Sequence, residues 1–348
     1  MMKRVFLVLY ILILISCKTS EKAEYLNPDK VFNLKDTLKG IVLEATLSQD
    51  SASYTSLLYT PIGIICKTGL NNELFYLLDS VKGDKVTSCG CKGRGRGELL
   101  SCISYDYNSK TNNLYVWDIY LNSIHSFSLT DSCKFEKRER LIKVNTHLNK
   151  IKSVNDSLFA VLTFHPDQSV GLIDKTGNFI SKLPYKTIEN KEIDYDLNYF
   201  SSTIAISPDK RHLAVSDLNF PSIKLYSISD NKLKILWEKM IFEPSYTIVN
   251  KWYRINDDQQ FGFGDIHMST ENIYVLSHGV KYKEFRNGVF TNNNRIYILQ
   301  FDYEGNYIKC FVLNDFMYLF EISPDGKSLY GKIDEALIKK YSLSGNPD

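Results

Sequence analysis

The most conspicuous local pattern in the sequence is a glycine- and arginine-rich hexapeptide, Gly93-Arg-Gly-Arg-Gly-Glu98. Its glycines can adopt positive φ and expose successive amides, and Arg94 and Arg96 place two guanidinium groups beside them, which suits an anion or the carboxylate of a sugar. The pattern lacks the Gly-Lys-Ser/Thr ending of a phosphate-binding loop, so it gives no support to nucleotide binding. We favour the simpler interpretation, a structural turn in which Glu98 pairs with an arginine or accepts hydrogen bonds from backbone amides.

Acid–base chemistry would need titratable side chains that converge. His165 and His267 each lie near an aspartate in the sequence, on connections that could face a central channel if the strands described below close into a ring. Asp118 and Asp217 end two corresponding strands, where they could line the channel as Ca²⁺ ligands or as an acid–base pair. In the favoured alternative, the histidines are satisfied loop residues and each aspartate begins the next turn. No Gly-x-Ser-x-Gly or His-Glu-x-x-His pattern is present.

An aromatic insertion is the remaining candidate for ligand contact. The run from Lys281 to Asn294 is the longest insertion between predicted strands, and it carries Tyr282, Phe285 and Phe290 among several asparagines. Sugars stack on aromatic rings and hydrogen-bond to amides, so the run predicts a glycan or peptide contact. A loop that covers the hydrophobic edge of a sheet explains the same residues equally well.

The amino terminus has the pattern of a bacterial export signal. Two basic residues precede an apolar run, Val5–Ile15, which is too short to span a bilayer as a helix. The tetrapeptide Leu14-Ile-Ser-Cys17 resembles the lipobox, and by that resemblance Cys17 would become the lipid-bearing first residue. We therefore expect a signal peptide over residues 1–16, a polar tether over 17–35, and a lipoprotein held outside the cytoplasmic membrane, facing either the periplasm or the exterior, with the outer membrane the favoured site.

Charge and cysteine content exclude some other classes of site. Removing Lys3 and Arg4 with the leader lowers Lys+Arg from 42 to 40, equal to Asp+Glu at 40, and a neutral chain offers nucleic acid no extended basic face. Six cysteines follow the lipobox: Cys66, Cys89, Cys91, Cys102, Cys133 and Cys310. No second pair completes a zinc site with Cys89 and Cys91, so we expect buried or loop thiols and no cofactor other than Ca²⁺ in the channel. The spacing leaves open a disulfide from Cys102 to Cys89 or Cys91.

The scaffold that must position these residues is entirely β. Two strand types alternate along the chain, each in six copies, and short polar turns separate them. The first type begins at Ile62, Asn113, Ser157, His212, Asn272 and Ser328, and the second at Leu74, Ile124, Val170, Ile223, Ile296 and Leu337. An ordered repeat with a period of roughly 40 to 60 residues predicts a six-bladed β-propeller of four-stranded antiparallel blades over residues 36–348.

The turns and the chain ends support the same fold. Ser207-Pro-Asp-Lys210 and Ser323-Pro-Asp-Gly326 place proline and aspartate where a type I turn needs them. The strand Gly40–Leu47 has no partner in its own blade. We expect it to complete the last blade beside the carboxy-terminal strands, because an open ring would expose unpaired strand edges.

With its lipobox, six blade units over about 39–343, Ser-Pro-Asp-Gly hairpins and the loop Gly93–Glu98, the chain resembles the six-bladed TolB-like β-propeller lipoproteins of Bacteroidota. Arg96 departs from the proline more usual there. The resemblance implies the fold and the envelope location but no activity. Our leading hypothesis is a non-enzymatic, membrane-anchored module that binds an envelope protein, peptide or glycan across one face of the disc. The alternative is an envelope hydrolase or lyase that uses channel-facing aspartates and histidines.

Overall fold

The computed structural model describes residues 23–32, 36–38, 40–43, 54–68, 72–82, 85–95, 98–129, 135–164, 169–185, 188, 202–288, 296–333 and 337–343. The predictions for the signal peptide, Cys17, Arg96, His165 and Phe290 lie outside these residues. Within the described part of the chain, no helix has the length and apolar character needed to cross a membrane.

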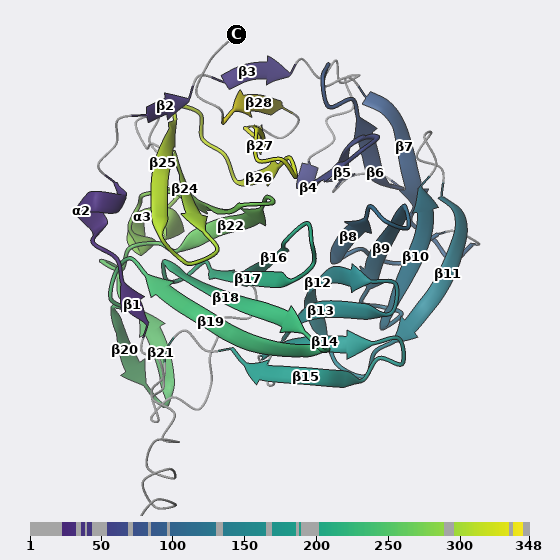
Figure 1. Ribbon diagram of the computed structural model, residues 1–348, viewed down its shortest axis with the longest axis horizontal. Coiled ribbons are helices and arrows are strands. Elements are labelled where there is room, and N and C mark those ends of the chain that lie inside the picture. The colour runs from purple at the N-terminus through teal and green to yellow at the C-terminus, as the bar shows by residue number, and fades with distance from the viewer. Residues whose placement is uncertain are drawn as a thin grey trace, which may run out of the picture.

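Six β-sheets surround a central axis in chain order, as Figure 1 shows. The first two blades are β4 (Tyr54–Thr60), β5 (Gly63–Thr68), β6 (Glu73–Leu78), β7 (Lys85–Cys91) and β8 (Ser104–Asn108), β9 (Asn113–Asp118), β10 (Ser123–Leu129), β11 (Phe135–Lys143). The next two are β12 (Leu148–Asn155), β13 (Leu158–Thr163), β14 (Ser169–Asp174), β15 (Phe179–Pro184) and β16 (Ser202–Ile206), β17 (His212–Asp217), β18 (Ser222–Ser229), β19 (Lys232–Met240). The fifth is β22 (Phe263–Met268), β23 (Asn272–Ser277), β24 (Ile296–Asp302), β25 (Tyr307–Leu313), and the sixth contains β26 (Leu319–Ile322), β27 (Ser328–Lys332) and β28 (Ile338–Ser342). The predicted all-β six-bladed propeller is confirmed.

The repeating strands of the sequence are the second and third strands of each blade. Neighbouring blades cover both faces of these strands, so the sequences of the strands are continuous apolar runs. In β13, for example, every residue is buried. The outer strand β15 alternates half-buried and exposed residues instead, because one of its faces meets solvent.

The hydrophobic core lies between adjacent blades. Phe75 of blade 1 packs edge-on against Tyr105 of blade 2 with ring centroids 5.0 Å apart, and Tyr115 of blade 2 meets Phe159 of blade 3 in the same way at 5.0 Å. Each interface forms its own cluster of buried side chains. The ring is therefore held together by contacts between neighbours, which leaves the axis free for polar side chains.

The amino-terminal segment follows the outer rim of blades 4, 5 and 6 (Figure 1). β1 (Glu24–Tyr25) and β2 (Asp36–Leu38) pair in parallel with β19 and β25, and α2 (Pro28–Val31) lies between them. β3 (Gly40–Leu43) is the outermost strand of the last blade and pairs antiparallel with β28. β1 and β2 thereby cover the outer edges of β19 and β25. Strands from the two ends of the chain share the sheet of the last blade.

Of the polar tether predicted over 17–35, residues 23–32 are described by the structure, and they lie on this rim. Val31 is buried against blades 4 and 5, Leu26 and Phe32 pack beside it, and the Tyr307 hydroxyl donates to the Val31 carbonyl at 2.9 Å. The three apolar side chains give the segment enough buried surface to hold it against the propeller.

The cysteines make no disulfide from Cys102 to Cys89 or Cys91. Cys89 is disulfide-bonded, whereas Cys66, Cys91, Cys102 and Cys310 are free thiols. Burial raises the pKa of the Cys102 thiol to about 12, so it is an unreactive core side chain.

Candidate functional site

Two hollows lie along the propeller axis, inside the ring of first strands β4, β8, β12, β16, β22 and β26. The upper hollow, of about 250 Å³, lies where these strands begin and is lined by Lys67, Lys150 and Asp265 among others. The lower hollow, of about 190 Å³, lies where they turn into the second strands and is lined by Asp106, Lys210 and Glu321 among others. Leu58, Lys152 and His267 line both hollows, so the two adjoin along the axis. We call the two hollows together the channel, and the shared level with Lys152 and His267 its charged waist.

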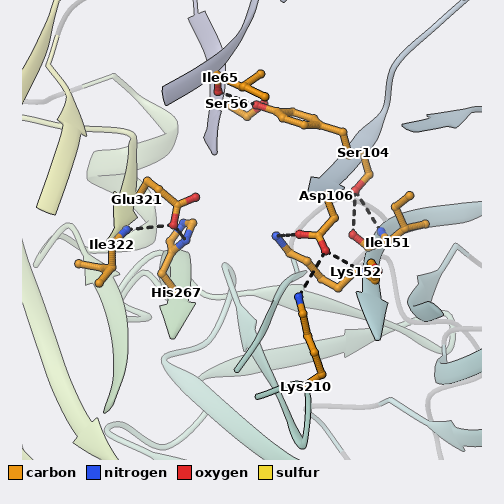
Figure 2. Close-up of polar contacts among 12 residues, drawn as sticks. Ser56, Ile65, Ser104, Asp106, Ile151, Lys152, Lys210, His267, Glu321 and Ile322 are labelled. Atoms are coloured by element: carbon orange, nitrogen blue, oxygen red, sulfur yellow. Dashed lines mark hydrogen bonds and ion pairs between the residues drawn. The ribbon is translucent and has the colours of Figure 1, made fainter. Parts of the chain in front are cut away.

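One wall of the waist is built on Asp106, which β8 directs toward the axis. Its carboxylate lies 3.3 Å from Lys152 Nζ and 3.9 Å from Lys210 Nζ, and it accepts a hydrogen bond from the Ser153 amide at 2.8 Å (Figure 2). Burial alone would lower the pKa of Lys152, but the charges of Asp106 and Glu321 outweigh it and raise that pKa. Asp106 is thus a fully engaged carboxylate.

The opposite wall is a histidine held between two carboxylates. His267 Nδ1 lies 2.9 Å from Glu321 Oε1, and Nε2 lies 3.2 Å from Asp265 Oδ2. Burial alone would lower the pKa of His267, but Glu321 and then Asp265 outweigh it and raise the pKa to about 10. The imidazole is therefore a cation at neutral pH with both nitrogens donating. A general base needs a pKa near the working pH, so this arrangement suits an ion network better than proton abstraction.

Of the predicted site residues that the structure describes, His267 is the one that lies in the channel. Asp265, the aspartate that lies near it in the sequence, lines the channel with it. The charged channel residues that sequence reasoning missed are Lys67, Asp106, Lys150, Lys152, Lys210 and Glu321. Lys150 and Lys152 flank the buried Ile151, and Asp265 and His267 flank the buried Ile266. Since alternate residues of a strand share a face, charges two apart on the first strand of a blade are the signal that would have found them.

Asp118 and Asp217 are not among the residues that line the channel: each ends a second strand and is buried there. Asp118 accepts hydrogen bonds from the amides of Leu100 and Leu121 and from both the amide and the hydroxyl of Ser101. Asp217 accepts from the amides of Asn219 and Phe220. Both carboxylates are fully buried, so the turn-holding interpretation describes them and the channel-ligand interpretation is wrong.

The glycine-rich loop is likewise organised from within. Glu98 Oε2 accepts a hydrogen bond from the Gly95 amide at 2.6 Å. A Cβ on Gly93 would lie 2.0 Å from the same oxygen, so the glycine is needed for this close approach. The carboxylate of Glu98 thus occupies the position that a bound anion would take, while Arg94 is exposed.

The aromatic insertion divides into a covering part and an accessible part. Phe285 of α3 (Tyr282–Arg286) stacks on Phe261 with ring centroids 3.6 Å apart. This side chain therefore fits the interpretation of the insertion as a covering loop. Tyr282 instead lines a lateral hollow of about 700 Å³ with Trp252, Arg254 and Arg286. Trp252 belongs to a hairpin, β20 (Tyr246–Val249) and β21 (Trp252–Ile255), inserted between blades 4 and 5, which sequence reasoning missed.

The lateral hollow and the upper hollow open on the same face of the disc. The first residue of β16, Ser202, pairs with Asp217 at the end of β17, so the beginnings of first strands and the ends of second strands share one face. Leu218 and Asn219, which follow β17, line the lateral hollow, and α3 follows the end of β23. We call the face that carries the beginnings of the first strands and the ends of the second strands the loop face.

Among the described residues, no group of three or more histidine, cysteine, aspartate or glutamate side chains is arranged to hold a metal ion. The Asp265–His267–Glu321 network agrees with this, because the cationic imidazole takes the place that a metal ion would need. Ca²⁺ in the channel remains a prediction from the sequence.

A family profile for TolB-like six-blade propellers matches residues 59–325. The chain belongs to this TolB-like family. Among solved structures it is similar to a protein from Bacteroides fragilis described as exported, at 12% identity and TM-score 0.57, with 92% of this chain and 97% of that chain covered. It is also similar to the WD40 repeats of RRP9, at 12% identity and TM-score 0.52, over 88% and 99% of the two chains. These likenesses extend to the fold. No significant relative is found among curated protein sequences.

Proposed function

We propose that this TolB-like propeller is an exported, envelope-associated binding module, anchored through lipid on Cys17, whose protein or peptide partner docks on the loop face. The lateral hollow carries the proposal. Trp252 is 38% exposed and Val249 53% exposed beside it, and Arg254 and Arg286 line it. Tryptophan, tyrosine and arginine are enriched among the few residues that dominate binding energy at protein interfaces.

The hollow is also built in the way that recognition sites are built. A rigid propeller holds an inserted hairpin and a short helix, so the contact residues come from loops on a fixed frame. Arg286 is oriented by Asp257 at 3.2 Å, which limits the side-chain entropy lost on binding. The disulfide at Cys89 suits an oxidising compartment, in keeping with export.

The hydrolase or lyase alternative has less support. Its best candidate residue, His267, is held as a cation by two carboxylates, and Asp118 and Asp217 are engaged in turns. Among the described residues that line the channel, no nucleophile is paired with an available base.

The test is capture from envelope extract on the immobilised mature chain, comparing wild type with Trp252→Ala and with Tyr120→Ala as the matched control. Tyr120 is an exposed aromatic on the loop face of blade 2, in the turn that follows β9. We expect a stoichiometric protein partner that Trp252→Ala loses and Tyr120→Ala keeps. A folded wild-type bait that captures nothing, or equal loss in both variants, would contradict the proposal. A captured partner that survives protease digestion would identify a glycan instead.

A further inference from the structure

The upper hollow contains more lysine than its own carboxylates neutralise. Lys67, Lys150 and Lys152 line it together with His267, and Asp265 is the acidic residue among its lining. Asp265 is already engaged by His267 at 3.2 Å and by the Ile266 amide at 2.9 Å. Lys152 is paired with Asp106. Among the residues that the structure describes, neither Lys67 nor Lys150 has an ion pair or a side-chain hydrogen bond.

The surroundings of Lys150 show that this excess of positive charge disfavours its charged form. Lys150 comes from the first strand β12 and is half-buried where it lines the upper hollow. Burial lowers its pKa; the positive charges of Lys152 and Lys67 act in the same direction, and Asp265 opposes them. An ammonium group in such a place is stabilised by a negative ligand, since an anion would replace the hydration that burial removes.

The remaining lining indicates what kind of anion would fit. Leu57, Ile204 and Leu319 contribute apolar atoms to the lining, and the lining residues include no arginine of the kind that phosphate sites use. Ser56, Thr203 and Tyr105 add hydroxyl groups; the Ser56 hydroxyl donates to that of Tyr105 at 3.1 Å. The volume of about 250 Å³ is many times what one water molecule needs, which leaves room for a small organic molecule.

We propose that the upper hollow binds a small organic carboxylate, with its acid group between Lys67 and Lys150 and its carbon skeleton against Leu57, Ile204 and Leu319. The upper hollow is separate from the lateral hollow, so the test of this proposal does not depend on whether the proposed protein partner exists. It gives the propeller a second ligand on the same face, at the mouth of the axial channel.

Calorimetric titration of the mature chain tests the proposal, with D-glucuronate, succinate and inorganic phosphate as the probes. We compare wild type with Lys150→Met, Lys67→Met and the control Lys110→Met, which removes an exposed lysine from the turn between β8 and β9. Urea unfolding of each variant shows that it folds. Methionine keeps the length of the lysine stem, so a loss of binding reports the charge.

We expect one of the two carboxylates to bind, with affinity falling at least tenfold in Lys150→Met and in Lys67→Met and staying within twofold in Lys110→Met. Binding should also weaken as NaCl rises from 50 to 500 mM, since the contact is between charges. Failure of both carboxylates to bind wild type at 20 mM would overturn the proposal. Binding of phosphate alone, or carboxylate binding unchanged by both lysine substitutions, would overturn it equally.

Discussion

Replacing His267 with glutamine should make the stability of the propeller less dependent on pH. The imidazole lies 2.9 Å from Glu321 and 3.2 Å from Asp265, and its pKa in the folded chain is raised to about 10. A group with a raised folded pKa contributes stability that is fully present below its unfolded pKa, about 6.5, and is lost as pH rises toward 10. The gap corresponds to at most about 5 kcal/mol at ~1.36 kcal/mol per pH unit.

The measured effect should be smaller, because solvent in the channel screens a side chain that is 13% exposed. Loss of one partner from a buried ion network costs roughly 3 kcal/mol. We therefore expect His267→Gln to lower the free energy of unfolding by about 3 kcal/mol at pH 6. The difference from wild type should shrink steadily between pH 6.5 and pH 10.

The assay is urea unfolding followed by tryptophan fluorescence at pH 6, 7, 8 and 9. His147→Gln serves as the control, because His147 is exposed and should change stability little at any of these values. If His267→Gln does not fold, Glu321→Gln keeps the imidazole and removes the carboxylate that raises its pKa most. A difference from wild type that is the same at pH 6 and pH 9 would refute the account of the network.

Three further predictions concern the scaffold. Gly93→Ala should lower the free energy of unfolding by about 1 kcal/mol in urea titrations, since its Cβ would meet Glu98 Oε2 at 2.0 Å and push the carboxylate away from the Gly95 amide; wild-type stability would contradict the assigned role of this hydrogen bond. Asp118→Ala should cost about 3 kcal/mol or more by the same measurement, because it leaves buried amides unsatisfied, and a loss under 1 kcal/mol would contradict the assigned role. Truncation after Tyr330 removes β28 and leaves β3 unpaired, so calorimetry should find no cooperative melt; a near-normal melt would disprove that these strands close the ring.

The scaffold was predictable because its repeating strands carry a strong local signal. Strands such as β13 are covered on both faces, which forces continuous apolar runs that stand out in a sequence. The turns at Ser207 and Ser323 were also predictable, because each serine hydroxyl donates a hydrogen bond to the aspartate two residues later in the chain.

The channel was much less predictable. Lys150 and Asp265 are polar residues within short strands, and only closure of the ring brings them together on an axis. Asp118 was misplaced for the complementary reason: its strand was recognised, but the burial of its carboxylate between two blades, where it accepts hydrogen bonds from Leu100 and Ser101, was not visible in the sequence. Residues 23–32 look polar on average, while three apolar side chains decide where they pack.

The most direct test of the proposed binding function is a hydrogen-exchange footprint of the mature chain with its captured partner bound. The account predicts slowed exchange in residues 246–255 and 282–286, which form the hairpin and helix beside Trp252, and unchanged exchange in the outer strands β11 and β15. Protection confined to the outer strands, or to the turns around the lower hollow, would place the partner elsewhere and contradict the assignment of the loop face.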